Sequence, residues 1–175
     1  YSGAERCSVR VRDMHSGEWL GFTIEDAQGD LAWSADGRHL FYTVLDEDHR
    51  PRWVYRRDLE AGADTLVFEE TDPGFFVGVD DTESGRFILI GSRDPETTEV
   101  RVIPADRPTE PARCLLEREP GVEYEVTDPD DHWVILTNRG GADDFRIVTA
   151  PLDASEPARW RDLVPHRPGT LVQSM

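Results

Sequence analysis

Short apolar segments alternate with turn residues along the whole chain, and the first complete set lies between Asp30 and Glu70. A central turn, Ala35-Asp36-Gly37, suits an Asp that bonds its own backbone and a Gly that adopts a positive φ. The segments that resemble strands are Leu31–Ser34, Leu40–Val44, residues 52–59 and Thr65–Phe68. Four short antiparallel strands in about 40 residues are typical of one blade of a β-propeller.

The same pattern repeats at a nearly constant spacing. The second strands of successive sets begin at positions 38, 86 and 132, which are 48 and 46 residues apart. The third strands begin at positions 6, 52, 99 and 145, at spacings of 46, 47 and 46 residues. Two independent landmarks with one period indicate a repeat architecture. No stretch has a helical period, so the sequence predicts an all-β fold.

We therefore expect a partial β-propeller of four-stranded antiparallel blades, with about three and a half blades in the chain. A half blade is expected at residues 1–26, whole blades at 30–70, 75–118 and 123–165, and the start of another blade at 169–175. The strands expected in the second and third whole blades are Phe75–Val79, Phe87–Ile90, Val100–Ile103, Arg113–Leu116, Tyr124–Thr127, Trp133–Thr137, Phe145–Thr149 and Trp160–Val164.

The charge of the chain excludes some classes of partner. Its formal net charge is −17, and its 19 basic residues are all Arg. Nucleic acids and anionic membranes attract positive surfaces, so neither is expected as a partner. The acidity could instead attract cationic substrates, or it could simply keep the surface solvated. No apolar stretch approaches membrane-spanning length, and we expect no signal peptide at the start.

Side chains that could perform catalysis or hold a metal form no recognised motif. The sequence has neither a Gly-x-Ser-x-Gly elbow nor a phosphate-binding loop. We expect local roles for the five histidines, which are His15, His39, His49, His132 and His166. The same holds for the acid pairs Asp80-Asp81, Asp130-Asp131 and Asp143-Asp144. No catalytic, cofactor-binding or metal-binding residue is therefore predicted, and no cofactor.

Aromatic and sulfur-containing residues are expected to have structural roles. The tryptophans at positions 33, 53, 133 and 160 lie on predicted strands, where core packing is expected rather than ligand stacking. Cys7 and Cys114 also lie on predicted strands, and we expect them to be free thiols in a reducing compartment. A cytoplasmic protein is therefore expected.

Several ordered motifs carry a family resemblance: Leu31-Ala-Trp-Ser-Ala-Asp-Gly-Arg-His-Leu-Phe-Tyr-Thr, Arg50-Pro-Arg-Trp-Val-Tyr-Arg, Asp64-Thr-Leu-Val-Phe-Glu-Glu-Thr-Asp, Thr97-Thr-Glu-Val-Arg, and Tyr124-Glu-Val with Leu136-Thr-Asn-Arg-Gly-Gly-Ala-Asp-Asp-Phe-Arg-Ile. Together they resemble the N-terminal propeller of the prolyl oligopeptidase family, and most of all its oligopeptidase B members. One departure is Asp144, where the family often has Asn.

The resemblance implies a serine peptidase in which a seven-bladed propeller covers an α/β-hydrolase domain that holds the Ser, Asp and His of the triad. Oligopeptidase B-like members cut after Arg or Lys, and prolyl oligopeptidases cut after Pro. No triad residue can be assigned to a position in this sequence. We therefore expect the hydrolase domain of the same parent chain to be a partner, and this 175-residue piece to be inactive alone.

In such a protein the propeller would act as a passive gate. Radially packed blades leave a narrow channel lined by their first strands, here near Leu31–Ser34, Phe75–Val79 and Tyr124–Thr127. Short peptides would pass while folded proteins would not, and negative charge would concentrate Arg- or Lys-containing peptides. Open sheet edges also predict that the isolated piece self-associates.

Two alternatives remain open from the sequence, because a propeller fold alone does not specify a function. The first is a non-enzymatic propeller that binds proteins or ligands. The second, which has less support, is a propeller that binds or cleaves sugars.

Overall fold

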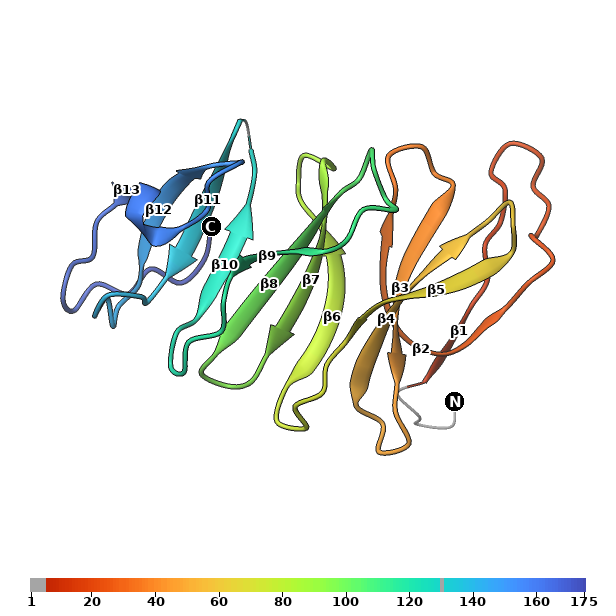
Figure 1. The fold of residues 1–175 in the computed structure, drawn as a ribbon, viewed down its shortest axis with the longest axis horizontal. Helices are drawn as coiled ribbons and strands as arrows, with labels where there is room; N and C mark the ends of the chain where they lie inside the picture. Colours follow the sequence, from red (N-terminus) through yellow and green to blue (C-terminus); the bar gives the residue numbers. More distant parts are fainter. Residues whose placement is uncertain (1–5, 130) are drawn as a thin grey trace.

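The computed structural model describes residues 6–129 and 131–175, and these form three antiparallel β-sheets in a row (Figure 1). Strands within each sheet follow the order of the chain, so neighbouring strands are joined by hairpins. The expected half blade begins with residues 1–5, which lie outside the described part. The prediction of an all-β fold built from repeated antiparallel sheets is confirmed.

The first sheet has five strands. They are β1 (Cys7–Val9), β2 (Ile24–Trp33), β3 (His39–Leu45), β4 (Pro51–Asp58) and β5 (Ala63–Glu69). The predicted turn joins β2 to β3, and its Gly37 has a φ of 67°. Ser34 fixes this turn, because its Oγ accepts a hydrogen bond from the His39 N–H at 2.9 Å and donates one to Asp36 Oδ1 at 2.6 Å.

The second and third sheets have four strands each. The second contains β6 (Phe76–Asp81), β7 (Phe87–Arg93), β8 (Thr98–Pro104) and β9 (Arg113–Leu116). The third contains β10 (Tyr124–Thr127), β11 (His132–Thr137), β12 (Arg146–Pro151) and β13 (Arg161–Val164), with a 3₁₀ turn, η1 (Pro157–Arg159), before β13. Every strand expected in these two repeats is present, with ends that differ by a few residues.

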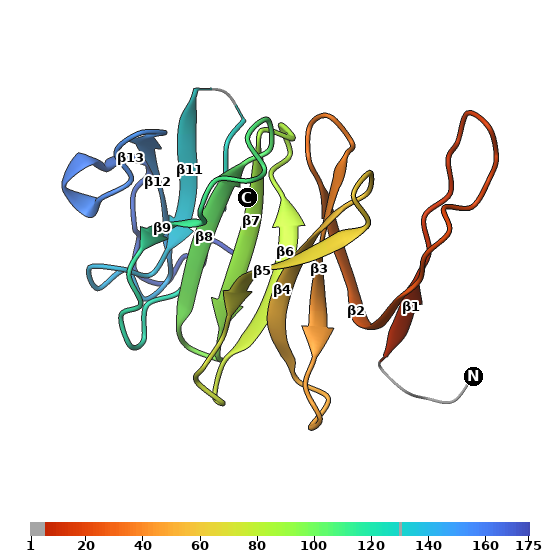
Figure 2. The same ribbon diagram turned by 45° about the vertical axis from the view of Figure 1, so that its right-hand side comes forward.

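The ends of the described chain differ from the simple repeat. β1 pairs with the beginning of β2, so both join the first sheet. Figure 2 shows that the segment between β1 and β2 lies at the end of the row, away from the second sheet. Residues 169–175 form no strand in the structure, although they were expected to open another blade. They instead contact Asp144, whose Oδ2 accepts from the Gly169 N–H at 2.6 Å and whose carbonyl accepts from the Val172 N–H at 3.0 Å.

The sheets are held together by apolar faces. Between the first and second sheets, buried residues such as Ala32, Phe41 and Val54 pack against Val77 and Ile88. Between the second and third sheets lies a second core, made of Val100, Val102, Leu115, Leu116, Tyr124, Val126, Trp133, Ile135, Val148 and Ala150. Burial of such apolar area is the main favourable contribution to folding, so each sheet depends on its neighbours for stability.

The alternation of side chains shifts by one residue between the second and third sheets. Phe87 and Trp133 match when the repeats are aligned at the predicted spacing of 46 residues. In the structure, however, Phe87 faces the third sheet and Trp133 faces the second, with ring centroids 4.7 Å apart. Between the first two sheets, by contrast, a spacing of 48 residues keeps the side-chain direction, because Phe41 packs toward the second sheet and Leu89 packs toward the third. The spacing of 46 residues therefore matches the turns and not the side-chain faces.

The helical content of the described residues is limited to η1. Within that part of the chain, no helix has the length and apolar character needed to cross a membrane.

Candidate functional site

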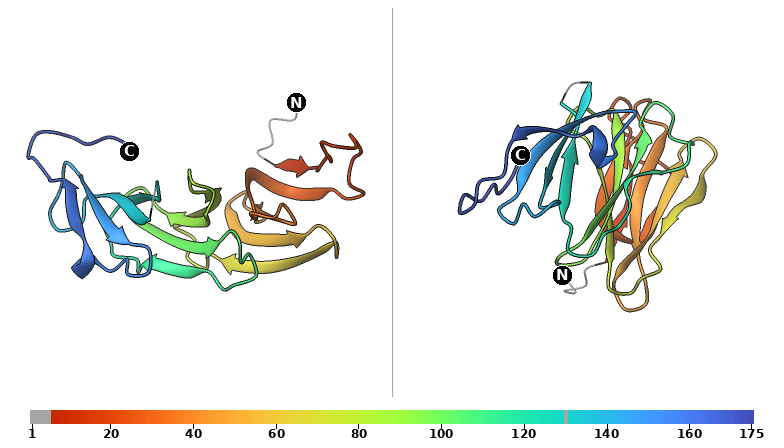
Figure 3. Two further views of the ribbon diagram at one scale, coloured as in Figure 1. Left: turned by 90° about the horizontal axis from the view of Figure 1, so that it is seen from above. Right: turned by 60° about the vertical axis from the view of Figure 1, so that its left-hand side comes forward.

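A hollow of about 1250 Å³ lies where β2, β6 and β10 of the three sheets converge. Viewed from above, the sheets follow one another along an arc (Figure 3). The hollow is lined by Gln28, Asp30 and Leu31 near β2, by Phe76 to Asp80 of β6, and by Tyr124 to Val126 of β10. All three segments that were expected to line a channel contribute to it, but only Leu31 of the segment Leu31–Ser34 does so, and Phe75 and Thr127 at the ends of the other two segments do not.

Carboxylates outnumber cations on the wall of this hollow. Asp30, Asp80, Asp94 and Glu125 line it, together with one guanidinium, that of Arg93. The Asp94 carboxylate caps its own turn, because its Oδ1 accepts from the N–H groups of Glu96 at 2.8 Å and Thr97 at 2.6 Å. Walls that carry mostly one sign of charge raise the local concentration of ligands of the opposite sign. The hollow therefore favours cationic groups.

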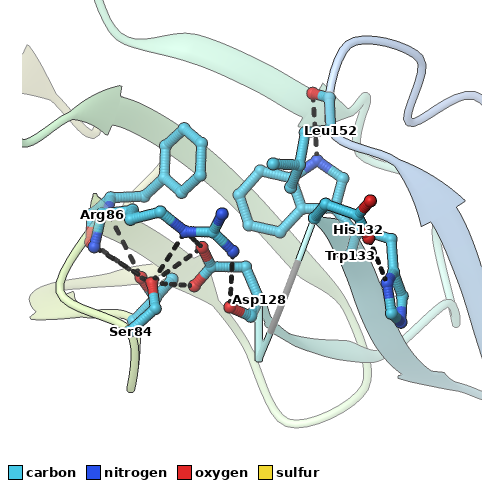
Figure 4. Close-up of polar contacts among 9 residues, drawn as sticks. Ser84, Arg86, Asp128, His132, Trp133 and Leu152 are labelled. Atoms are coloured by element: carbon cyan, nitrogen blue, oxygen red, sulfur yellow. Dashed lines mark hydrogen bonds and ion pairs between the residues drawn. The ribbon is translucent and has the colours of Figure 1, made fainter.

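Asp128 and Arg86 join the second and third sheets at one end of the strands (Figure 4). Asp128 follows β10 and is fully buried. Its Oδ2 accepts from Arg86 Nε at 2.8 Å, and its carbonyl oxygen accepts from Arg86 Nη2 at 3.0 Å. Ser84 Oγ also donates to this carboxylate, at 2.9 Å from Oδ1 and 2.8 Å from Oδ2. These contacts fix the β6–β7 turn against the end of β10.

This contact was not predicted, although the repeat contains a signal for it. Asp128 occupies the position that Ser34 and Thr82 hold in the first two repeats. Those hydroxyls accept from the N–H groups of His39 and Phe87 across their own turns. A carboxylate at this position can instead bind a cation of the preceding repeat. The change from a hydroxyl to a carboxylate at one repeat position was therefore the available signal.

Glu70 joins the first and second sheets at the opposite end of the strands. It is buried, and its Oε2 accepts from Arg118 Nη2 at 2.7 Å and from the hydroxyl of Ser92. Burial by itself would raise the pKa of Glu70. The hydrogen bonds from Arg118, Ser92 and the Asp72 N–H outweigh burial and hold the pKa below its ordinary value.

Tyr124 makes a further contact between sheets beside the hollow. Its hydroxyl accepts from the Val100 N–H at 2.6 Å and donates to the Leu116 carbonyl at 3.3 Å. Burial raises the pKa of Tyr124 far above its ordinary value, so the phenol stays neutral. Like Glu70 and Asp128, Tyr124 thus joins neighbouring repeats through polar contacts.

The histidines and acid pairs that were considered as ligands do not meet in one place. His39, His132 and His166 each lie near a carboxylate, those of Asp58, Asp131 and Asp144 respectively. His49 lines the hollow, and His15 lies in an exposed turn. Asp130 lies outside the described residues. In the part of the chain that the structure covers, no three or more metal-ligating side chains are grouped.

The tryptophans and cysteines can also be compared with expectation. Trp133 is fully buried and its Nε1 donates to the Leu152 carbonyl at 3.3 Å, as in Figure 4. Trp33 is 42% exposed, so the core role that was expected of it is wrong. The neighbouring Ala32 packs against the second sheet, so the Trp33 side chain lies on the opposite face of the first sheet. Cys7 and Cys114 are both free thiols.

Comparison with known proteins identifies the family. The model of the prolyl oligopeptidase N-terminal β-propeller domain matches residues 1–175. The chain belongs to the prolyl oligopeptidase family. Dipeptidyl aminopeptidase BI of Pseudoxanthomonas mexicana is 35% identical to this propeller, over 98% of the chain and 24% of the relative. Protease 2 of Moraxella lacunata is 33% identical, over 86% of the chain and 22% of the relative.

Solved structures agree with this family assignment. Oligopeptidase B from Leishmania major superposes on the propeller with a TM-score of 0.84 at 28% identity. The match covers 95% of this chain and 24% of that one. Oligopeptidase B from Trypanosoma brucei gives a TM-score of 0.83 at 25% identity, over 98% of this chain and 24% of the other. The fold is therefore a partial propeller, and the chain spans about a quarter of the length of these relatives.

Proposed function

We propose that this propeller segment is the substrate gate of a serine oligopeptidase that hydrolyses short peptides, preferably after Arg or Lys. The observation that carries the proposal is the hollow, because β2, β6 and β10 from all three sheets line it and carboxylates dominate its wall. A family of peptidases supports the reaction class. The α/β-hydrolase domain of the same parent chain would supply the catalytic triad.

The gate would act by size and by charge, with no reactive group of its own. Apolar cores between the sheets and the contacts of Glu70, Tyr124 and Asp128 would keep the passage narrow. An extended peptide could enter a passage that a folded protein could not. Asp30, Asp80 and Glu125 would raise the local concentration of peptides that carry Arg or Lys.

The cleavage preference needs a direct test because the relatives carry different names. They include a dipeptidyl aminopeptidase, a protease 2 and proteins described as prolyl endopeptidase-like. The parent protein should be assayed at full length with fluorogenic peptides that end in Arg, Lys or Pro. Each peptide should be tested with and without a serine-directed inhibitor, and cleavage after Arg or Lys that the inhibitor abolishes is the expected result. Cleavage after Pro alone would contradict the proposed preference for Arg or Lys but would still support a peptidase.

A charge variant tests the gate itself. Replacing Glu125 with Gln should lower kcat/KM for an Arg peptide about twofold at low salt, and the difference should shrink as salt rises. Glu83→Gln is the matched control, because Glu83 is exposed in the β6–β7 turn and does not line the hollow. Equal effects of the two changes would contradict electrostatic gating.

The proposal includes a cytoplasmic location, which the two free thiols support. The competing function is a propeller that binds partners without catalysis. A correctly folded parent protein that cleaves none of the peptides would favour that function.

A further inference from the structure

Two glycines face each other on the wall of the hollow. Gly78 of β6 pairs directly with Gly91 of β7, and both line the cavity. Neither has a positive φ, so the backbone does not require glycine at either position. A glycine inside a strand weakens the strand and often marks a place where another backbone or a ligand approaches closely.

The space above Gly91 is open, whereas the space above Gly78 is bounded by a carboxylate of the first sheet. A Cβ placed on Gly91 would have no neighbouring atom within 4 Å. A Cβ on Gly78 would lie 3.2 Å from Oδ2 of Asp30, which reaches over from the first sheet. The glycine pair therefore leaves a stretch of bare backbone with a carboxylate at its edge. Packing between the sheets does not account for the missing side chain at Gly91.

The neighbouring cross-strand pairs on the same face have complementary chemistry. On one side of the glycines lies the pair Phe76 and Arg93, and on the other lies the pair Asp80 and Leu89. Phe76 is 48% exposed although it is a large aromatic residue. Arg93 is also exposed, and its side chain makes no hydrogen bond or ion pair with any residue in the ranges 6–129 and 131–175. An aromatic ring and a free cation thus lie together on the wall of the hollow.

The positions of these pairs give the approximate size of a ligand. Phe76 and Asp80 are four residues apart on one strand, a distance of roughly 13 Å. An extended peptide of about four residues has the same length. A guanidinium binds a carboxylate through parallel hydrogen bonds, and an aromatic ring offers apolar area to a neighbouring side chain.

We propose that the Gly78–Gly91 pair is a docking floor for the backbone of a short peptide, held between Arg93 and the carboxylates of Asp80 and Asp30. Arg93 takes the free C-terminal carboxylate, Phe76 contacts the last side chain, and the two carboxylates take a cationic group about four residues away. The peptide thereby enters the hollow in one orientation. This inference rests on the proposed function, because it specifies how the gate recognises its peptides.

The first test fills the floor with a side chain. Gly91→Val in the full-length protein should raise KM for a tetrapeptide by at least about tenfold. One methylene more or less in a binding pocket changes substrate discrimination by about tenfold or more, and Val adds three carbon atoms. Its kcat should change little, and its Tm should stay the same or rise, because Val suits a strand better than Gly. Gly21→Val is the matched control, since Gly21 also has an ordinary φ and open space and lies outside the hollow.

A purely structural glycine would behave in the opposite way. In that case Gly91→Val would lower Tm and leave KM unchanged, and this result would overturn the proposal. The second test does not depend on how that variant folds. It compares cleavage of two peptides that differ only in a free or an amidated C-terminus.

Arg93→Gln should reduce the preference for the free carboxylate by about two- to fivefold, the range expected for an exposed ion pair. Arg93→Lys keeps the charge and should retain most of the preference. Arg159→Gln is the control. Arg159 is an exposed residue on η1, and it is not among the residues that line the hollow. A parent protein that cleaves no peptide would overturn both the proposed function and this inference. Cleavage with a preference that Arg93→Gln does not change would overturn the inference alone.

Discussion

Arg86 of the second sheet binds the fully buried Asp128 of the third, with Nε 2.8 Å from Oδ2. The two residues belong to different repeats and are 42 residues apart in the chain. A buried carboxylate is costly unless charged or polar donors satisfy it. One guanidinium and one hydroxyl, that of Ser84, satisfy this carboxylate and help to hold the third sheet on the second.

Removing this guanidinium should destabilise the domain. Arg86→Met leaves Asp128 with Ser84 as its remaining side-chain donor, and we expect a loss of about 2 to 3 kcal/mol in the free energy of unfolding. The Arg86 side chain is 42% exposed, so the lower end of that range is expected. Urea denaturation measures the loss. Arg38→Met is the control, because Arg38 occupies the same repeat position in the first sheet and is exposed there. It should change stability by less than about 0.5 kcal/mol, and equal losses would contradict the role of Asp128.

Glu70 should make stability depend on pH in the acidic range. Because its pKa in the folded state lies below the ordinary value of 4.5, the unfolded state binds more protons. Its contribution is therefore fully present above about pH 4.5 and is lost as the pH falls through the folded-state pKa. Glu70→Gln should be less stable than the wild type at pH 7, and the gap should narrow toward pH 3. Glu69→Gln serves as the control, since Glu69 forms only a partly exposed pair with Arg52. A gap that stays constant over this range would exclude this linkage.

Two tryptophans in different environments provide a test of the core. Trp133 is fully buried against Phe87, and Trp133→Ala should cost about 3 to 5 kcal/mol. Trp33 is largely exposed, and Trp33→Ala should cost about 1 kcal/mol or less. Thermal unfolding of the two variants gives the comparison. Similar shifts in Tm would mean that the boundary between the second and third sheets is not the main core.

The last strand should promote self-association of the isolated chain. β13 pairs with β12 on one side only, and its Leu163 is 59% exposed. An apolar edge strand can pair with another copy, so Leu163→Lys should shift sedimentation toward the monomer. Leu171→Lys is matched for exposure, at 54%, and lies outside any strand. If the wild-type chain sediments as a stable monomer, this expectation is wrong.

The repeat of turns and apolar segments was sufficient to predict the fold class and nearly all strands of the second and third sheets. It could not predict which face each side chain takes. Phe87 and Trp133 illustrate the reason. Both follow turns of equal length, since Asp81 pairs with Ile88 and Thr127 pairs with Val134, and yet the two rings face in opposite directions along the row of sheets. The spacing of landmarks records the turns, whereas the face that a side chain takes depends on how each sheet packs on its neighbours.

The site was predicted in part. The first strands do line a hollow, as the radial packing of propeller blades implies. The partners of Asp128 and Glu70 were not predicted, since each pair joins residues from different repeats. The carboxylate at position 128 signals a change from the repeat, but it does not say which cation is bound. The strand expected at residues 169–175 also failed to appear. A strand needs a partner for its backbone groups, and the tail binds Asp144 instead.

Each sheet keeps its ladder of hydrogen bonds to itself, and neighbouring sheets touch through side chains and isolated backbone hydrogen bonds, such as that from the Ala35 N–H to the Ala105 carbonyl. A force applied to the two ends of the chain therefore acts on the apolar faces and on a few polar contacts between the sheets as well as on the ladders. Such faces slide apart more easily than paired strands shear. Under tension the domain should lengthen in discrete steps, as one whole sheet after another separates from the row.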